Sequence, residues 1–239
     1  VFAILKADDK YEKFVFITGI TKFTQISLFS VLNNLSNISF LPEYAVICGI
    51  TEEEIDNNFK PELEKMAEVN GWTLRHTHDN LKDFYDGYHF SPRNMVDIYN
   101  PFSLINALDT QNLNSYWASS GATSMLPTFV KDVELRLQDF EDCMILRNTL
   151  ETSDVTGGGS ELFLYQSGYL TIKSCQGNIY HLGFPNEEVK QALYECVLPA
   201  LTLRQEADTQ SLQAQVYQYL EFKELGKAMK AIKALVADV

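Results

Sequence analysis

Residues 13–23, KFVFITGITKF, place an apolar run, a glycine and a lysine in the order in which many phosphate-binding loops begin. A P-loop has the pattern G-x-x-x-x-G-K-[ST], in which backbone N–H groups surround the phosphates, the lysine neutralises them and the hydroxyl helps to hold Mg²⁺. This segment has one glycine, no Gly-Lys pair, and Phe23 where the hydroxyl belongs. It therefore predicts a buried strand followed by a turn rather than a phosphate loop.

Three polar residues at the end of this predicted strand could still contact a phosphate that other segments hold. Open α/β sheets bind their ligands at the C-terminal ends of the strands. Thr18, Thr21 and Lys22 occupy that place in the sequence. We consider them candidate nucleotide-contacting residues.

The residues His76, His78 and Asp79 have types that could bind a metal ion. A metal site needs a third ligand and hydrogen-bonded supporting groups around the ligands. The sequence identifies no acidic or cysteine partner for the two histidines, so we expect solvated or capping roles and no metal site. The isolated His89 is expected to pack or to form hydrogen bonds.

Hydrolytic sites are not indicated by the remaining polar residues. The serines at 119–120 and 167 lack the G-x-S-x-G elbow of serine hydrolases. A nuclease needs acidic residues and a lysine clustered on adjacent strands to hold Mg²⁺. The acidic residues of 52–54 and 62–68 lie instead along predicted helices. We therefore expect no catalytic residue in this chain.

The segment YDGYHFSPRN, residues 85–94, combines a turn signal with aromatic residues. An Asp-Gly pair favours a turn, and the tyrosines on either side could enclose it. In one interpretation the segment is an aromatic staple that fixes a helical region on the α/β part; in the other, Arg93 or Tyr88 faces a nucleotide or a partner. The candidate residues for these structural or interface roles are Tyr85, Asp86, Gly87, Tyr88 and Arg93.

The elements that must position these residues begin with an α/β pattern over residues 1–75. Continuous apolar runs at 14–18 and 44–49 predict two strands buried on both faces. A helix is expected after each strand, and the second opens on a capping box formed by Thr51 and Glu54. Two strands cannot complete a doubly wound sheet, so the rest of that sheet is expected from elsewhere.

The remainder of the chain divides at TGGGS, residues 156–160, which predicts a flexible link. Residues 76–155 predict a helical and irregular region, with Asn100 and Pro101 as a strong helix start. Residues 160–239 predict a short helix, a hairpin and further amphipathic helices, the outline of a winged-helix-like module. The predicted chain is helix-rich overall.

The composition limits which binding partners and which cellular compartment we expect for this protein. The 239 residues carry a net charge of −13, which disfavours DNA or a membrane held by bulk electrostatics. No apolar run reaches the roughly 20 residues of a membrane span, and no secretory signal is visible. The four cysteines are widely spaced, which fits a reducing compartment, and we expect a cytoplasmic protein. The chain opens on Val1 rather than Met, as expected of a piece of a longer protein.

An ordered series of segments resembles a bacterial family, the AAA-ATPase-like proteins of gut Bacteroidetes, often joined to a C-terminal PD-(D/E)XK nuclease-like domain. The series spans residues 1 to about 195 and consists of FVFITGITKF, LFSVLNNL, YAVICGITEEEI, YDGYHFS, IYNPFSLINAL, YWASSG, YQSGYLTIK and YHLGFPNEEV.

The resemblance implies a P-loop NTPase-like core whose phosphate loop and Mg²⁺-binding acidic strand precede this chain. ATP and Mg²⁺ are then cofactors of the full-length protein, with none bound by this chain alone. The strand at 14–18 corresponds to the sensor strand of related ATPases, which makes Thr18 the first candidate and Lys22 the second. The nuclease-like domain would follow the C-terminal helix, so this chain's partners would be its own phosphate-loop region and that domain.

Three functions stay open on the sequence. The first is a fragment of an AAA-ATPase-like protein, inactive alone, that senses nucleotide and couples its state to the nuclease-like domain. The second is a non-catalytic interaction module that binds a protein partner or self-associates. The third is a DNA-binding winged helix, which ranks last because the short helix of residues 161–168 has no lysine or arginine.

Overall fold

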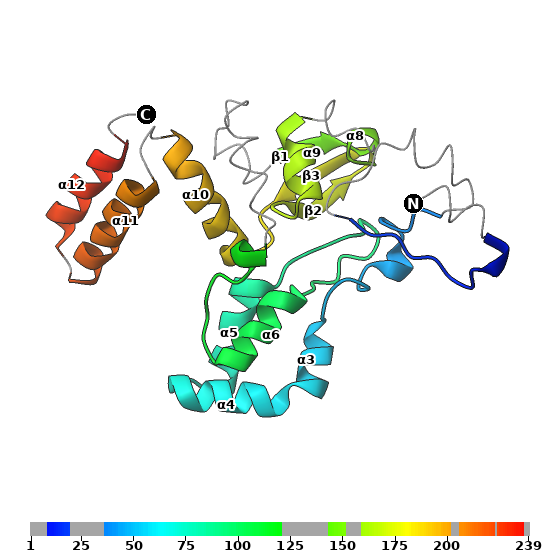
Figure 1. Ribbon diagram of the computed structural model, residues 1–239, viewed down its shortest axis with the longest axis horizontal. Coiled ribbons are helices and arrows are strands. Elements are labelled where there is room, and N and C mark those ends of the chain that lie inside the picture. The colour runs from blue at the N-terminus through cyan, green and yellow to red at the C-terminus, as the bar shows by residue number, and fades with distance from the viewer. Residues whose placement is uncertain are drawn as a thin grey trace. The chain divides into compact units, whose positions relative to one another are not determined.

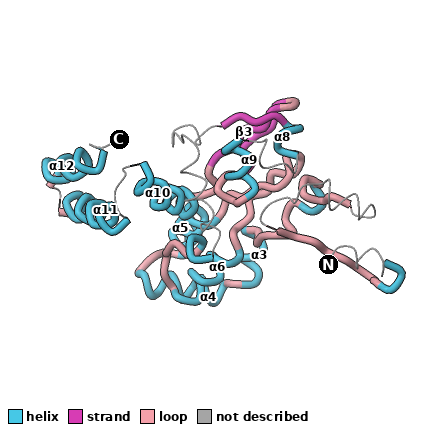
Figure 2. The backbone as a smooth tube through the Cα atoms, turned by 45° about the horizontal axis from the view of Figure 1, so that its top comes forward, coloured by secondary structure: helices cyan, strands magenta, loops and turns pink. Residues whose placement is uncertain are grey.

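A computed structural model describes residues 9–19, 36–120, 143–151, 159–201, 206–222 and 224–236. The chain divides into two compact units, residues 1–122 with 136–190, and residues 123–135 with 191–239. The first unit holds both a helical layer and a small sheet, which lie as separate groups in Figures 1 and 2. As predicted, the described structure is helix-rich. The predicted domain limits at residues 75, 155 and 160 stay a prediction.

The helical layer has two helix starts at the residues that the sequence signals predict. It consists of α3 (Glu52–Asn58), α4 (Lys60–Asn70), α5 (Leu74–Tyr85) and α6 (Pro101–Thr110). Thr51 and Glu54 form the predicted capping box at the start of α3. The Asn100 side chain accepts hydrogen bonds from two backbone N–H groups at the start of α6, with Pro101 as the first helical residue. These local signals act within one turn of helix, which is why the sequence was sufficient to predict them.

One apolar core holds the four helices together. Its buried members come from every helix of the layer and from the strand-like residue Tyr99: Ile55, Leu63, Met66, Leu81, Tyr85, Tyr99, Leu104, Ala107 and Leu108. Leu63, Met66 and Ala67 of α4 recur at the i, i+3, i+4 spacing that puts side chains on one helix face. This core fixes α3 and α5, on which the sites below are built.

The sheet has three antiparallel strands in the order β1-β3-β2. They are β1 (Cys143–Leu146), β2 (Thr171–Gln176) and β3 (Ile179–Gly183), accompanied by α8 (Arg147–Glu151) and α9 (Gly159–Gln166). The predicted hairpin is confirmed, and Gly177 supplies the positive φ of +60° in its turn. The prediction of a helical or irregular segment around residue 145 was wrong, because pairing with β3 makes residues 143–146 a strand.

The segments 14–18 and 44–49, which the sequence predicted as buried strands, are not strands in the described structure. Residues 14–19 have no assigned secondary structure, and residues 42–49 form a short 3-10 helix, η2 (Pro42–Tyr44), followed by turns. Apolar side chains of both segments are exposed instead of buried. A strand needs a neighbour for its backbone hydrogen bonds, and these segments have no strand partner among the described residues.

The second unit contains the two helices α11 (Glu206–Glu221) and α12 (Leu225–Val236), and α10 (Glu187–Leu201) crosses from the first unit into it. In α12, Ala228 and Ala231 are buried. The amphipathic helices predicted at this end of the chain are therefore present. Further short helices in the first unit are η1 (Asp9–Tyr11) and η3 (Trp117–Ser120).

Several predictions fall on residues outside the described ranges. They concern the helix expected over residues 26–35, the candidate residues Thr21 and Lys22, and most of the TGGGS link.

Candidate functional site

The segment of residues 85–91 connects the helical layer to the sheet. Tyr85, the last residue of α5, is fully buried, and its hydroxyl both donates to the carbonyl and accepts from the N–H of Asn114, each at 2.9 Å. The Tyr88 hydroxyl donates to the carbonyl of Gly168 beside the sheet at 3.0 Å. The candidate residues Tyr85 and Tyr88 thus lie in the interior and contact other segments of the first unit, whereas Arg93 is exposed.

The predicted turn lies between these tyrosines and packs against the start of α10. Gly87 has a φ of +92°, and a Cβ atom there would collide with the backbone carbonyl of Pro185. The Asn186 side chain donates to the carbonyl of Asp86 at 2.9 Å. Glycine is therefore required at position 87 both by the backbone angle and by the close approach of another segment.

His89 joins the same segment to β2. Its N–H donates to the Thr171 hydroxyl at 2.7 Å, and its Nδ1 lies 2.9 Å from the carbonyl of Ile172. Its Nε2 lies 2.7 Å from a carboxylate oxygen of Asp97. The expectation that His89 packs and forms hydrogen bonds is confirmed, and its two partners on β2 lie more than 80 positions away in sequence.

A polar cavity of about 690 Å³ opens beside this segment, between the end of α5, the hairpin and the start of α10. Its size falls in the range of small-molecule sites. Charged side chains line it: the Lys82 ammonium lies 3.8 Å from Asp86 and 3.6 Å from Asp97, and Lys173 donates to the Pro185 carbonyl at 3.3 Å. Asp86 is only 2% exposed, and its Oδ1 has no hydrogen-bond partner among the described residues.

Burial changes the proton affinities of two groups in this cavity. Desolvation raises the pKa of Asp86 to about 6, and the negative charges of Asp97 and Glu52 act in the same direction. A hydrogen bond from Gly87 and the charge of Lys82 oppose this rise. Desolvation also lowers the pKa of Lys173. Paired groups with shifted pKa values beside a cavity are typical of functional sites and also of structural charge networks.

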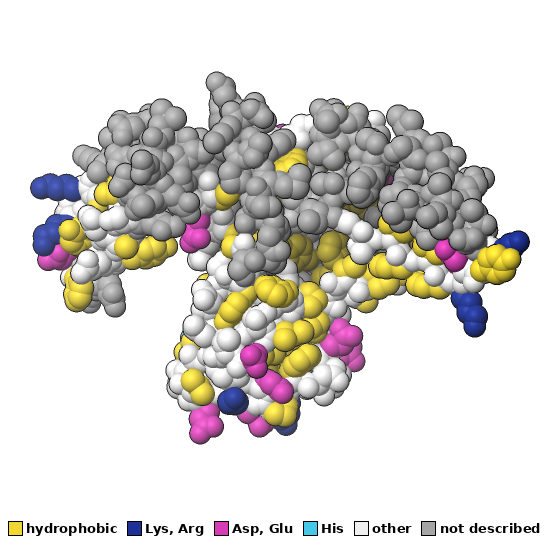
Figure 3. Space-filling model, viewed as in Figure 1, with side chains coloured by type: hydrophobic (Ala, Val, Ile, Leu, Met, Phe, Trp, Pro, Cys, Tyr) yellow, Lys and Arg dark blue, Asp and Glu magenta, His cyan; other side chains and the backbone are white. Residues whose placement is uncertain are grey.

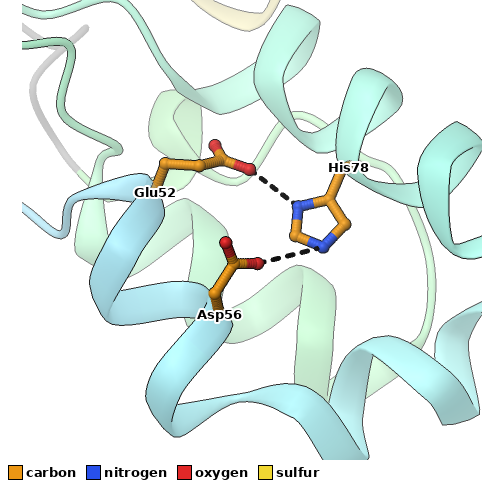
Figure 4. A group of neighbouring side chains, drawn as sticks. All are labelled: Glu52, Asp56 and His78. Carbon is orange, nitrogen blue, oxygen red and sulfur yellow. Dashed lines mark hydrogen bonds and ion pairs between the residues drawn. The ribbon is translucent and has the colours of Figure 1, made fainter.

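A second cluster lies on α3 and α5 and consists of Glu52, Asp56 and His78 (Figure 4). A Glu52 oxygen lies 2.7 Å from Nδ1 of His78, and an Asp56 oxygen lies 3.4 Å from its Nε2. Glu52 and Asp56 are one helical turn apart, so both project from the same side of α3. His78 lies between them from the neighbouring helix.

Tyr99 supports this cluster from inside the protein. Its hydroxyl donates to the second carboxylate oxygen of Glu52, and the residue is 1% exposed. Burial raises the pKa of Tyr99 well above its usual range, so the hydroxyl keeps its proton and remains a donor. Glu52 therefore has one oxygen fixed by Tyr99 and the other directed at His78.

The sequence alone led us to expect a solvated or capping role for His78 and did not identify its partners. Glu52 and Asp56 looked like ordinary exposed acidic residues at the start of a helix, and they are 26 and 22 positions away from the histidine. His76 instead contacts the ring of Trp72, with ring centroids 5.6 Å apart, and Asp79 pairs with Arg75 at 3.9 Å. The one signal that the sequence did carry is the i, i+4 spacing of Glu52 and Asp56 on a predicted helix.

No described contact joins the predicted nucleotide-contacting residues to the cavity beside residues 85–91 or to the cluster on α3 and α5. Thr18 is exposed in a segment without regular secondary structure, and Thr21 and Lys22 lie outside the described residues. Two phenylalanines that precede Thr18 stack on one another, with ring centroids 6.4 Å apart: Phe14 and Phe16.

Comparison with known proteins gives one relative that matches. The chain is 32% identical over 219 residues to the "uncharacterized protein in vnfD 5′ region" of Azotobacter chroococcum mcd 1. The match covers 86% of this chain, and this chain spans 39% of the relative's length. No family profile and no solved structure matches the chain. Among the described helices, none has the length and apolar character needed to cross a membrane.

Proposed function

We propose that this chain is the coupling part of an AAA-ATPase-like protein, which senses bound nucleotide but does not hydrolyse it alone. The proposal rests on one observation: apolar side chains are exposed in both segments predicted as buried strands, residues 14–18 and 44–49. Phe14 is 82% exposed and Phe16 50%, while Val46 and Ile47 are 38% and 54% exposed. Figure 3 displays hydrophobic side chains lying open along this part of the chain.

Burying these side chains against further protein would be energetically favourable. Burying one large apolar side chain contributes about 1.5–3 kcal/mol. Four such residues lie on two short segments. Covering them by pairing with further strands would therefore stabilise the protein considerably. Under the proposal, residues 14–18 and 44–49 become strands of a P-loop NTPase-like sheet, whose other strands, phosphate loop and Mg²⁺ ligands belong to other parts of a longer protein. The greater length of the Azotobacter relative supports this reading.

The proposal gives the candidate residues their roles. Thr18 would lie at the C-terminal end of its strand, where an open sheet faces its ligand, with Thr21 and Lys22 next to it. The helix α9, the β2–β3 hairpin and α10 would act as the winged-helix-like module that passes the nucleotide state to a nuclease-like domain. The linkage between the two parts is the segment of residues 85–91, because its hydrogen bonds join the helical layer to the sheet.

An interaction module without nucleotide is the second candidate function. The same exposed apolar segments could bind a protein partner or a second copy of the chain. DNA binding ranks third, since α9 carries Glu161 and neither lysine nor arginine.

Nucleotide binding by a longer protein separates these functions. The Azotobacter relative and this chain would be purified, and binding and hydrolysis of Mg²⁺-ATP measured for both. We expect the relative to bind ATP and this chain to show no hydrolysis above background. Failure of the relative to bind ATP would favour the interaction module. Hydrolysis by this chain that is lost in Thr18→Ala would show that the chain has a complete site and would contradict the proposal.

A further inference from the structure

We propose that Glu52, Asp56 and His78 form a binding site for a divalent transition-metal ion of the zinc type. The three residues offer one nitrogen and two carboxylate oxygens, and the three ligand atoms lie within 4.8 Å of one another. Histidine nitrogen and carboxylate oxygen are common zinc ligands, and three protein ligands plus water is the arrangement of open zinc sites. This inference does not depend on the proposed nucleotide function.

The charges of the cluster are unbalanced without an ion. Glu52 and Asp56 place two carboxylates beside the two ring nitrogens of His78, at 2.7 and 3.4 Å. No lysine or arginine pairs with Glu52 or Asp56 among the residues that the structure describes. A divalent ion would balance the charges of the two carboxylates.

The helices hold the ligand residues in place before an ion binds. The capping box of Thr51 and Glu54 fixes the first turn of α3, which contains Glu52. The buried Tyr99 hydroxyl holds the far oxygen of Glu52, the kind of supporting hydrogen bond that orients ligands in metal sites. The core that α3 and α5 share fixes the distance between the carboxylates and the histidine.

The cluster is open enough to admit an ion with its water molecules. The His78 side chain is 25% exposed, and those of Glu52 and Asp56 are 43% and 59% exposed. A site with three protein ligands on one side and water on the other fits an ion that tolerates four-coordination, such as Zn²⁺ or Co²⁺. Mg²⁺ and Ca²⁺ prefer oxygen ligands only and are expected to bind weakly here.

The test is titration of the whole chain with Zn²⁺ by calorimetry after treatment with a chelator, with Co²⁺ absorption as a second readout. We expect saturable binding of one ion. His78→Gln and Asp56→Asn should each weaken that binding at least tenfold. His76→Gln is the matched control: His76 lies two positions away on the same helix, has an exposed side chain, and contacts Trp72 rather than a carboxylate. It should bind Zn²⁺ as the unmodified chain does.

Two results would overturn the proposal. The first is the absence of saturable binding by the unmodified chain. The second is binding that is unchanged in both His78→Gln and Asp56→Asn, because the ion then binds elsewhere, for example at a cysteine. Asp56 is exposed, so Asp56→Asn is expected to keep the fold, and its circular dichroism and thermal midpoint show whether a loss of binding is local.

Discussion

His89 and Thr171 hydrogen-bond to each other twice across 82 positions of sequence. The His89 N–H donates to the Thr171 hydroxyl at 2.7 Å, and that hydroxyl donates to the His89 carbonyl at 3.0 Å. Both residues are buried. The Thr171 side chain, on the edge strand β2, thus forms hydrogen bonds with both the backbone N–H and the backbone carbonyl of His89.

Thr171→Val should therefore destabilise the fold. Valine has nearly the same shape but leaves the N–H and the carbonyl of His89 without a partner, and each unsatisfied buried group costs about 1–3 kcal/mol. We expect the free energy of unfolding to fall by about 2–4 kcal/mol, measured by urea denaturation. Ser174→Ala, on an exposed position of the same strand, should change it by less than about 0.5 kcal/mol. Equal effects of the two substitutions would mean that the hydrogen bonds are unimportant.

Gly87→Ala should be more damaging than Gly177→Ala. Both glycines have positive φ, so alanine costs about 1–2 kcal/mol of backbone strain at either position. At Gly87 the added methyl also meets the Pro185 carbonyl, whereas at Gly177 nothing lies within 4 Å. Thermal unfolding of the two variants measures the difference, and we expect a clearly lower midpoint for Gly87→Ala. Equal midpoints would contradict the close packing of the turn against α10.

Asp86 should make stability depend on pH between about 4 and 6. Its pKa is raised from 3.8 to about 6 in the folded protein, so the folded state binds this proton more tightly than the unfolded state. The stabilisation is present in full below pH 4 and is lost as the pH rises through about 6. The cavity is open to water, so we expect a change of about 2 kcal/mol, less than the full shift implies.

The measurement is the difference in unfolding free energy between the unmodified chain and Asp86→Asn, which cannot titrate. Relative to this variant, the unmodified chain should lose stability as the pH increases from 4 to 7. Asp83→Asn, an exposed neighbour on α5, is the control and should leave the pH dependence of the chain unchanged. A difference between the unmodified chain and Asp86→Asn that stays constant over this range would show that Asp86 titrates normally.

Exposed apolar residues of the N-terminal part should cause self-association of the isolated chain. Replacing Phe16 and Ile47 together by serine removes two of the exposed side chains. In sedimentation velocity, we expect the unmodified chain to show a concentration-dependent larger species and the double variant to move toward monomer. Met144→Ser removes an exposed residue of the sheet and should have little effect. A strictly monomeric unmodified chain would contradict the prediction.

Short-range signals in the sequence were reliable because their physics is local. The capping box at Thr51, the Pro101 helix start and the Gly177 hairpin depend on hydrogen bonds and backbone angles within a few residues. Residues 143–146 show the opposite case. Their alternation of buried and exposed positions depends on pairing with β3, which lies more than 30 positions away, and nothing nearby indicated a strand.

The apolar segments 14–18 and 44–49 show where a sequence pattern lacks its structural context. Their residue types favour strands, and the described structure leaves them unpaired with side chains exposed. Backbone N–H and C=O groups form a strand only beside another strand. The residue types of these segments therefore favour strands, but the described part of this chain offers no strand for them to pair with.

By itself, the sequence determined a helix-rich chain, the helix starts at Thr51 and Asn100, the hairpin and the aromatic turn at residues 85–88. Only the tertiary structure decided which charged residues face one another. Glu52 meets His78 because a shared core places α3 and α5 side by side, and Asp97 meets both His89 and Lys82. Charge–charge contacts act over a few ångströms in space, and spacing along a chain does not encode those distances.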